Sequence, residues 1–217
     1  MIRMKLLNNG VKPLTNLINI SYWNLIKTTD ISLEQVVDCH LNVFPDSLYN
    51  KFGKRFLVKT FSWYLRNPMK RKLLSFEKNN IVCGFLTMRM TDDKDSYYRY
   101  IFPTFIHSII MFPKAILDKK FLSLILSPII TKNNSIVDSA TMELVSLGVR
   151  IQNRNEGIAT KLISEFERIS KLSLSKTLIL SVKEDNKNAI DFYFNHGWII
   201  NHSHKCNANY VILKKEI

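Results

Sequence analysis

The residues best suited to chemistry lie in a short polar loop between an apolar strand at 142–149 and an amphipathic helix that begins at Gly157. The first turn of a helix presents unpaired N–H groups and the positive end of the helix dipole, and both attract phosphate. Gly157 and Ala159 leave room for an anion close to the backbone, and Thr160 offers a hydroxyl donor. Arg154 can add paired hydrogen bonds from its guanidinium group. The loop therefore predicts a pyrophosphate site.

Arg150 places a second guanidinium group at the start of this loop. The loop is not a P-loop, because no Gly-Lys-Ser/Thr follows it. It is also not a dinucleotide fingerprint, because only one of the three glycines is present. The N-terminus of a helix that binds no ligand can contain the same residues. The loop alone therefore leaves the phosphate-binding and the purely structural interpretations open.

A second block of polar and aromatic residues follows about 30 residues later, after an apolar strand at 177–182. It reads Asn186-x-x-Ala189-Ile190-x-x-Tyr193-x-x-x-Gly197-Trp198. This block resembles the Asn-x-x-Ala-x-x-x-Tyr-x-x-x-Gly-Phe signature of the GNAT acetyltransferases. The loop, Arg154-x-x-Gly157-x-Ala159, resembles the same family's Gln/Arg-x-x-Gly-x-Gly/Ala signature. The resemblance is strong over residues 141–198, and its departures are Ala159 for the commoner Gly and Trp198 for Phe.

The resemblance implies a direct acetyl transfer from acetyl-CoA, with no metal ion. The backbone of the strand before the loop would hold the pantetheine arm, the loop would hold the pyrophosphate, and Asn186 would face the arm. The implied cofactor-binding residues are Leu147, Gly148, Val149, Arg154, Asn155, Glu156, Gly157, Ile158, Ala159, Thr160, Asn186 and Tyr193. Asn186 and Tyr193 are nearly two helical turns apart, so their side chains share a face.

Two residues are candidates for acid–base chemistry. The resemblance gives Tyr193 the role of general acid for the departing thiolate, and the alternative is a core aromatic residue beside Phe192 and Phe194. Glu143 is the candidate base, because burial in an otherwise apolar strand would make its carboxylate more basic. A solvated strand-end carboxylate, or a reaction with no dedicated base, remains open. Neither Cys nor Ser lies where an acyl-enzyme would be expected, so we expect no covalent intermediate.

Hydrophobic periodicity and turn residues predict the elements that position these side chains. Ser32 and Gln35 have the spacing of a capping box, and Asn79-Asn80 suits a tight hairpin turn. Helices are expected at 32–44, 47–65, 157–171 and 188–195, and strands at 18–27, 73–78, 81–90, 141–149, 177–182, 198–201 and 210–214.

These elements predict a mixed α/β fold in one domain, residues 1–217. With the resemblance, the expected architecture is GNAT-type: a central, mostly antiparallel sheet, splayed between its fourth and fifth strands and flanked by helices. A bulge near 146–148 could open that splay. Within the domain we expect an N-terminal arm at 1–17, a hydrophobic insertion at 97–135 and an acetyl-CoA-binding core at 141–198.

Composition sets the cellular context. The formal net charge is +13, which suits nucleic acid, an anionic membrane, a phosphorylated molecule or simply a solvated basic surface. The three cysteines form no Cys-x-x-Cys pair, no signal peptide is apparent, and no apolar run is long enough to span a membrane. We therefore expect a cytoplasmic protein. His202, His204 and Cys206 lack a fourth ligand, which argues against a metal site.

The expected acceptor is a primary amine on a small molecule. The segment from His40-Leu41-x-x-Phe44-Pro45 to Gly53-x-x-Phe56-Leu57 resembles GNAT proteins of surface-polysaccharide synthesis, which would suggest an amino sugar, free or nucleotide-linked. A protein amine is the first alternative. An inactive GNAT-fold module that binds nucleic acid or membrane is the second, and the intact motifs disfavour it.

Two partner questions stay open. The basic helix at 47–65 and the insertion could rest on a membrane, or the apolar side of that helix could pack on the sheet. A homodimer is also open.

Overall fold

The computed structural model of the protein describes residues 2–6, 30–111, 140–202 and 209–217. The helical elements are α1 Asp30–Val43, η1 Leu48–Phe52, α2 Gly53–Trp63, α3 Tyr97–Met111, η3 Ile151–Asn153, α5 Ile158–Leu172 and α6 Lys187–Asn195. The strands are β1 Ile2–Leu6, β2 Arg71–Lys78, β3 Ile81–Met90, β4 Thr141–Val149, β5 Thr177–Lys183, β6 Ile199–Ile200 and β7 Tyr210–Glu216.

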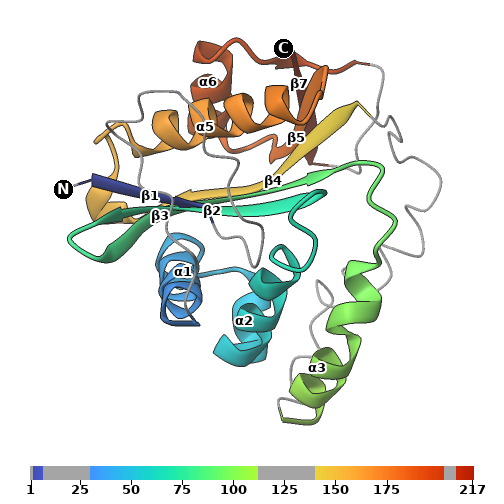
Figure 1. Ribbon diagram of the computed structural model, residues 1–217. Coiled ribbons are helices and arrows are strands. Elements are labelled where there is room, and N and C mark those ends of the chain that lie inside the picture. Colours follow the sequence, from blue (N-terminus) through green and yellow to red (C-terminus); the bar gives the residue numbers. More distant parts are fainter. Residues whose placement is uncertain (1, 7–29, 112–139, 203–208) are drawn as a thin grey trace, which may run out of the picture.

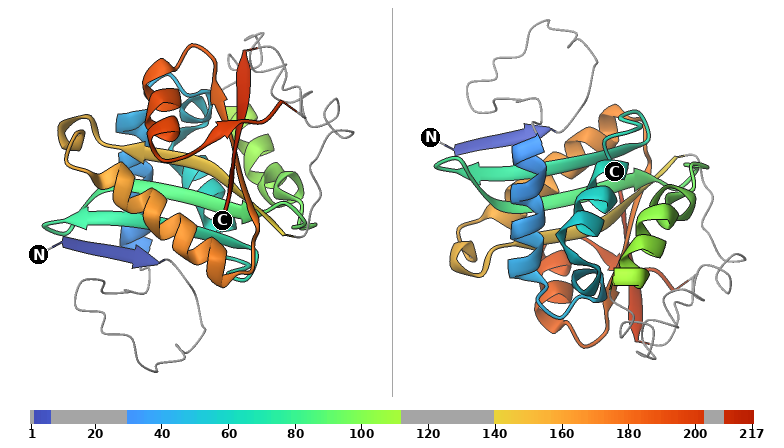
Figure 2. Two further views of the ribbon diagram at one scale, coloured as in Figure 1. Left: turned by 90° about the horizontal axis from the view of Figure 1, so that it is seen from above. Right: turned by 90° about the horizontal axis from the view of Figure 1, so that it is seen from below.

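The strands form one sheet in the order β1-β2-β3-β4-β5-β7-β6. Every neighbouring pair is antiparallel except β4 and β5, which run parallel. Helices α1 and α2 cover one face of the sheet and α5 covers the other, as Figures 1 and 2 show. Helix α3 packs beside α2 and extends past the edge of the sheet (Figure 1). This is the mixed α/β, mostly antiparallel architecture that the sequence predicts.

Each face of the sheet has its own apolar core. On the α5 face, alternate residues of the central strands meet Leu162 and Phe166. On the other face, Phe85 of β3 packs with Val36 of α1 and Phe61 of α2. The alternation of side chains along a strand explains why both faces of these strands are apolar, since helices cover both.

The sheet opens between β4 and β5, as expected. Their parallel pairing runs from Thr141 and Thr177 to Leu144 and Leu180, and then stops although both strands continue. The register of β4 against β3 shifts at the same place, where Val145 is the extra residue. A bulge increases local twist and bends its strand, so it directs β4 away from β5. It lies just before the predicted position at 146–148.

The tight hairpin between β2 and β3 is confirmed. Asn79 and Asn80 both have positive φ, 53° and 62°. Two consecutive residues with positive φ make the turn whose twist matches that of the flanking strands, and Asn tolerates this conformation well.

Several local predictions are wrong. Helix α1 begins at Asp30, so Ser32 lies inside it, and Gln35 accepts a hydrogen bond from the backbone N–H of Val82 at 3.1 Å instead of closing a capping box. The expected helix at 47–65 is two helices, because Gly53 has a φ of 79° at their junction.

The N-terminal arm and the hydrophobic insertion, for which no helix or strand was assigned at 1–17 and 97–135, each contain one. Within the arm expected at 1–17, Ile2–Leu6 form an edge strand that pairs with β2. Part of the insertion at 97–135 is helix α3, which continues through Pro103. The strand expected at 18–27 and the rest of both segments lie outside the described residues. In the described part of the chain, every helix is too short or too polar to cross a bilayer.

Candidate functional site

The loop after β4 reaches the first turn of α5 through two residues with positive φ, Asn155 at 63° and Gly157 at 72°. A Cβ built on Gly157 would meet no atom within 4 Å, so the space in front of this turn is open. The first bond closing the helix runs from the N–H of Lys161 to the carbonyl of Gly157. The N–H groups of the preceding turn therefore have no partner within the helix and are available to an anion.

Charged side chains of both signs lie near this turn. Arg154 is exposed and follows the turn of η3. Glu156 would repel a phosphate, but Lys78 donates to it at 3.0 Å, and this hydrogen bond lowers the pKa of the Glu156 carboxyl. Arg150 was expected to place a second guanidinium group beside the anion. Instead, its Nε donates to the backbone carbonyl of Val82 at 2.6 Å and so ties the loop to β3.

His196 links the loop to the second sequence block. Its Nδ1 lies 2.7 Å from the carbonyl of Phe192, and its Nε2 lies 3.3 Å from the hydroxyl of Thr160. A carbonyl only accepts, so Nδ1 carries the proton, and in the neutral ring Nε2 accepts from Thr160. Sequence reasoning missed this bridge, because His196 next to Gly197 indicated only the end of a helix.

A cavity of about 710 Å³ lies where β4 and β5 diverge. It is lined by residues of α1, α2, α3, β3, β4, β5 and α6. Of the sequence-predicted residues, Leu147, Asn186 and Tyr193 line it together. Asn186 also caps α6, since its Oδ1 accepts from the N–H of Ala189 at 3.3 Å. Strand β4 and the Asn186–Trp198 block therefore meet at one opening in the sheet, whereas the loop at 154–160 does not line it.

The remaining predicted residues do not line this cavity. Gly148 packs against α1, because a Cβ there would come within 2.9 Å of Phe85 and 3.1 Å of Val43. Val149 is the last residue of β4 and leads into the loop. Residues 154–160 form the loop and the first turn of α5, beyond the end of β4.

Tyr193 is 7% exposed and packs edge-on against Trp198, with 5.7 Å between ring centroids. Burial raises the pKa of its phenol, because the charged phenolate would be poorly solvated there. The side chain thus stays protonated at neutral pH while it lines the cavity. Both sequence interpretations, core residue and proton donor, are compatible with this position.

Glu143 lies in β4 beside Arg89 of β3, and the two form an ion pair with Arg89 Nε 2.6 Å from Glu143 Oε2. Arg89 lines the cavity. Burial lowers the pKa of the Arg89 guanidinium, but the Glu143 carboxylate together with Tyr64 and Tyr98 raises it, so the net shift is upward. The candidate base is therefore engaged by a cation, a partner that sequence reasoning did not identify.

The α1–α2 side of the cavity is largely aromatic, and one polar ring is buried there. His40 is 9% exposed, and among the described residues neither ring nitrogen has a hydrogen-bond partner. It packs against the rings of Phe44 and Phe61. Burial lowers the pKa of His40 to about 4, so the imidazole is neutral at physiological pH. The aromatic residues lining this side are Phe44, Tyr49, Phe61, Trp63, Tyr64, Tyr97 and Tyr98.

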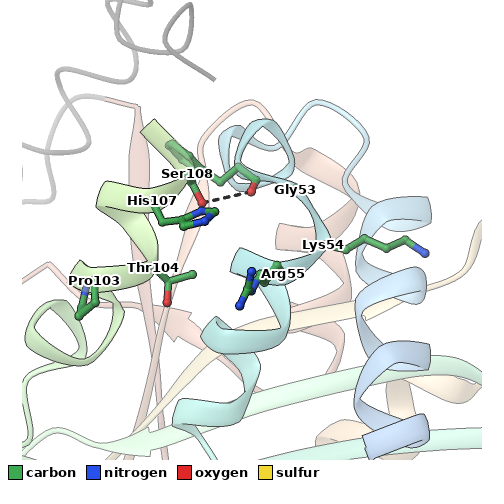
Figure 3. A pocket seen from close by; sticks show the side chains of 8 residues that line it. Gly53, Lys54, Arg55, Pro103, Thr104, His107 and Ser108 are labelled. Carbon is green, nitrogen blue, oxygen red and sulfur yellow. Dashed lines mark hydrogen bonds between the residues drawn. The ribbon is translucent and has the colours of Figure 1, made fainter. Parts of the chain in front are cut away.

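A smaller cavity of about 400 Å³ lies between the start of α2 and α3. Figure 3 shows Arg55, Thr104 and His107 around it, and the Ser108 hydroxyl donating to the carbonyl of Phe52 at 3.4 Å. None of the sequence-predicted residues lines this cavity. It is separate from the opening between β4 and β5.

The described residues contain no cluster of His, Cys, Asp and Glu side chains that could hold a metal ion. His204 and Cys206 of the sequence-level alternative lie outside the described residues.

A sequence profile of the acetyltransferase (GNAT) family matches residues 37–198. A search of curated protein sequences gives no match. Solved structures share the fold at low identity.

The PaiA N-acetyltransferase from Thermoplasma acidophilum, in complex with coenzyme A, has 13% identity and a TM-score of 0.54 over 88% of this chain and 97% of its own. The GNAT domain of S. lividans PAT has 10% identity and a TM-score of 0.56 over 86% of each chain. The ribosomal-protein-S18-alanine N-acetyltransferase from Escherichia coli has 13% identity and a TM-score of 0.51 over 88% of this chain and 90% of its own.

Proposed function

Because this chain belongs to the GNAT acetyltransferase family, whose members use acetyl-CoA, we propose that it transfers acetyl from acetyl-CoA directly to a primary amine in the cavity between β4 and β5. The observation that carries the proposal is the course of β4, which lines that cavity at 144–147 and then leads into the loop before an open, glycine-capped helix N-terminus. These two features give one ligand a place for its pyrophosphate and a place for its reactive end.

The proposed binding mode follows from the unpaired part of β4. Beyond Leu144 the edge of β4 has no partner in β5, so the backbone of Leu147 and Val149 can form strand-like hydrogen bonds with the pantetheine amides. The pyrophosphate then meets the N–H groups of Ile158, Ala159 and Thr160, with Arg154 beside it. The open space at Gly157 is where a Cβ would obstruct this approach.

In the proposed reaction, the amine nitrogen forms a bond to the thioester carbonyl carbon and the carbon–sulfur bond breaks. The departing sulfur takes a proton from the Tyr193 phenol, and the amine loses one. Glu143 can take that proton only if its contact with Arg89 loosens. An amine that arrives neutral can lose its proton to the phenolate that Tyr193 has become, which restores the phenol without a further protein base, and the ion pair makes this the simpler route.

The acceptor is proposed to be a small molecule, because a cavity of about 710 Å³ is within the range of small-molecule sites. Amino sugars are one class to test. A protein amine is the alternative, and the Escherichia coli relative named for ribosomal-protein alanine supports including peptides.

Calorimetry with acetyl-CoA tests the proposal. Gly157→Asp places a carboxylate at the pyrophosphate position and strains a backbone with φ of 72°, so we expect affinity to fall at least about tenfold. Ser164→Asp is the matched control, because it adds the same charge on the exposed side of α5. The proposal fails if wild-type protein does not bind acetyl-CoA, or if the two variants bind it equally.

We also propose that the protein is cytoplasmic and that it makes a peripheral contact with anionic membrane. Phe102 and Ile110 of α3 are 58% and 72% exposed, and Ile106 between them is 40% exposed. They follow one another at four-residue spacing and so form a stripe on one side of the helix. The net charge of +13 favours an anionic surface over a neutral one.

A further inference from the structure

The cavity has an uneven distribution of charge. Among the described residues that line it, the permanently charged side chains are Arg89 and Lys183, and none is a carboxylate. Glu143 contacts Arg89 without itself lining the cavity. The charge presented to a ligand is therefore positive, which is unexpected for a site that only binds an amine.

Arg89 is held in a fixed orientation. Its Nε donates to Glu143 at 2.6 Å, and the described residues accept no hydrogen bond from its two terminal nitrogens. The guanidinium fork can therefore bind a planar or tetrahedral oxyanion end-on through these nitrogens. Because Glu143 holds the side chain in advance, little conformational entropy is lost when a ligand binds.

Two tyrosine phenols lie near enough to this guanidinium to interact with it electrostatically. Tyr64 and Tyr98 also line the cavity. Burial raises the pKa of both phenols, and the nearby Arg89 offsets part of that shift. Both phenols stay protonated and can donate hydrogen bonds. The cavity thus has a subsite rich in donors, on the α2–α3 side of the sheet and away from the pyrophosphate loop.

We infer that the acceptor carries an oxyanion, a carboxylate or a phosphate ester, in addition to its amine, and that Arg89 binds this oxyanion. The inference rests on the proposed function and names the acceptor class for the same site. It places the amine between the oxyanion at Arg89 and the thioester near Tyr193.

Matched amine pairs test the inference by calorimetry on protein saturated with coenzyme A, which cannot react. One pair is glucosamine 6-phosphate and glucosamine, and the other is phenylalanine and phenylalaninamide. In wild-type protein we expect the member that carries the oxyanion to bind about tenfold more tightly than its partner without one, in at least one pair. This is the effect of a charge-assisted hydrogen bond. The pair that shows the preference distinguishes a phosphate from a carboxylate.

Arg89→Gln should abolish this preference while leaving the affinity for coenzyme A unchanged. Arg89→Lys keeps the charge but not the fork, so it should retain part of the preference, and it covers the case in which Arg89→Gln is misfolded. Arg168→Gln removes the same charge from the exposed surface of α5, where Arg168 pairs with Glu165, and should behave as wild type.

Equal affinity within both pairs, a preference that survives in Arg89→Gln, or no binding of any of the four amines would each overturn the inference. These results leave the proposed function intact as long as acetyl-CoA binds and Gly157→Asp weakens that binding. Loss of acetyl-CoA binding by the wild-type protein would instead refute the proposed function.

Discussion

Tyr193 combines a buried ring with a place at the wall of the cavity. If it donates the proton to the leaving sulfur, Tyr193→Phe removes the donor and changes little else, because the ring still packs on Trp198. We expect kcat to fall about 100-fold, within the usual range for general acid catalysis, with the Kd for acetyl-CoA unchanged.

Tyr100→Phe is a suitable control for this measurement. The Tyr100 hydroxyl lies 2.9 Å from that of Ser62, and the residue does not line the cavity. An unchanged kcat in Tyr193→Phe would show that Tyr193 is only a core residue.

His40 makes the fold sensitive to acid. Its pKa is near 6.5 in an unfolded chain and about 4 in the folded protein, where burial disfavours the charged ring. The unfolded state therefore binds more protons between these two values. The contribution of His40 to stability is fully present above pH 6.5 and is lost as the pH falls toward 4.

His40→Phe should remove this dependence. The free energy of unfolding, measured by urea titration, should lose a slope of up to about 1.4 kcal/mol per pH unit in that window. At neutral pH the variant should be at least as stable, because both ring nitrogens of His40 are buried without partners among the described residues. An unaltered pH dependence would mean that His40 does not titrate in this way.

At the scale of elements, His196 connects the start of α5 with the end of α6. His196→Ala deletes the contacts to Thr160 and Phe192, so the two helices that flank the proposed cofactor site lose a common anchor. We expect the KM for acetyl-CoA to rise about fivefold, the equivalent of one hydrogen bond of ordinary strength. The thermal midpoint should shift little.

Asn195→Ala serves as the neighbouring control, because Asn195 is exposed at the end of the same helix. Equal KM values for the two variants would contradict an anchoring role for His196.

The sequence predicted most elements, because local patterns determine them. The strands at 73–78 and 81–90 have strong periodicity and a turn of two asparagines, and both formed as expected. The helix expected at 47–65 is two helices because a single glycine interrupts it, and its apolar spacing continues across the break. The strand Ile2–Leu6 was missed because its partners in β2 lie 68 to 76 residues away, from Leu6 with Leu74 to Ile2 with Lys78.

The candidate site was predictable only in part. The loop and the Asn186–Tyr193 block were identified from fixed spacings within single segments. The contact of Arg89 with Glu143 and that of His196 with Thr160 join residues 54 and 36 positions apart, and no local pattern records such pairs. The acceptor side of the cavity is assembled from α1, α2, α3 and β3, which explains why the sequence did not identify the acceptor.

On the scale of the whole molecule, α3 lies far from the loop proposed to bind the cofactor (Figure 1). The exposed side chains of Phe102, Ile106 and Ile110 form a stripe along this helix. If this stripe rests on membrane, the protein should co-sediment with anionic phosphatidylserine vesicles, and less so with phosphatidylcholine vesicles or at high salt. Phe102→Glu together with Ile110→Glu should abolish co-sedimentation and leave acetyl-CoA binding intact.

Lys187→Glu, at the start of α6, is the control. It changes the charge at its site more than either Glu substitution in α3 does. Its sedimentation should decrease only slightly. Sedimentation of the double variant at the wild-type level would exclude α3 as the contact.

The early end of the pairing between β4 and β5 has a consequence for amide hydrogen exchange. The β4 amides that face β5 beyond Leu144 have no strand partner there, whereas β4 is paired with β3 at every residue from Met142 to Val149 except the bulged Val145. The β4 amides on the β5 side should therefore exchange with deuterium quickly, and those on the β3 side slowly. A bound pantetheine arm would cover the fast edge, so mass spectrometry of peptides containing residues 145–149 would report occupancy of the site without any label or turnover.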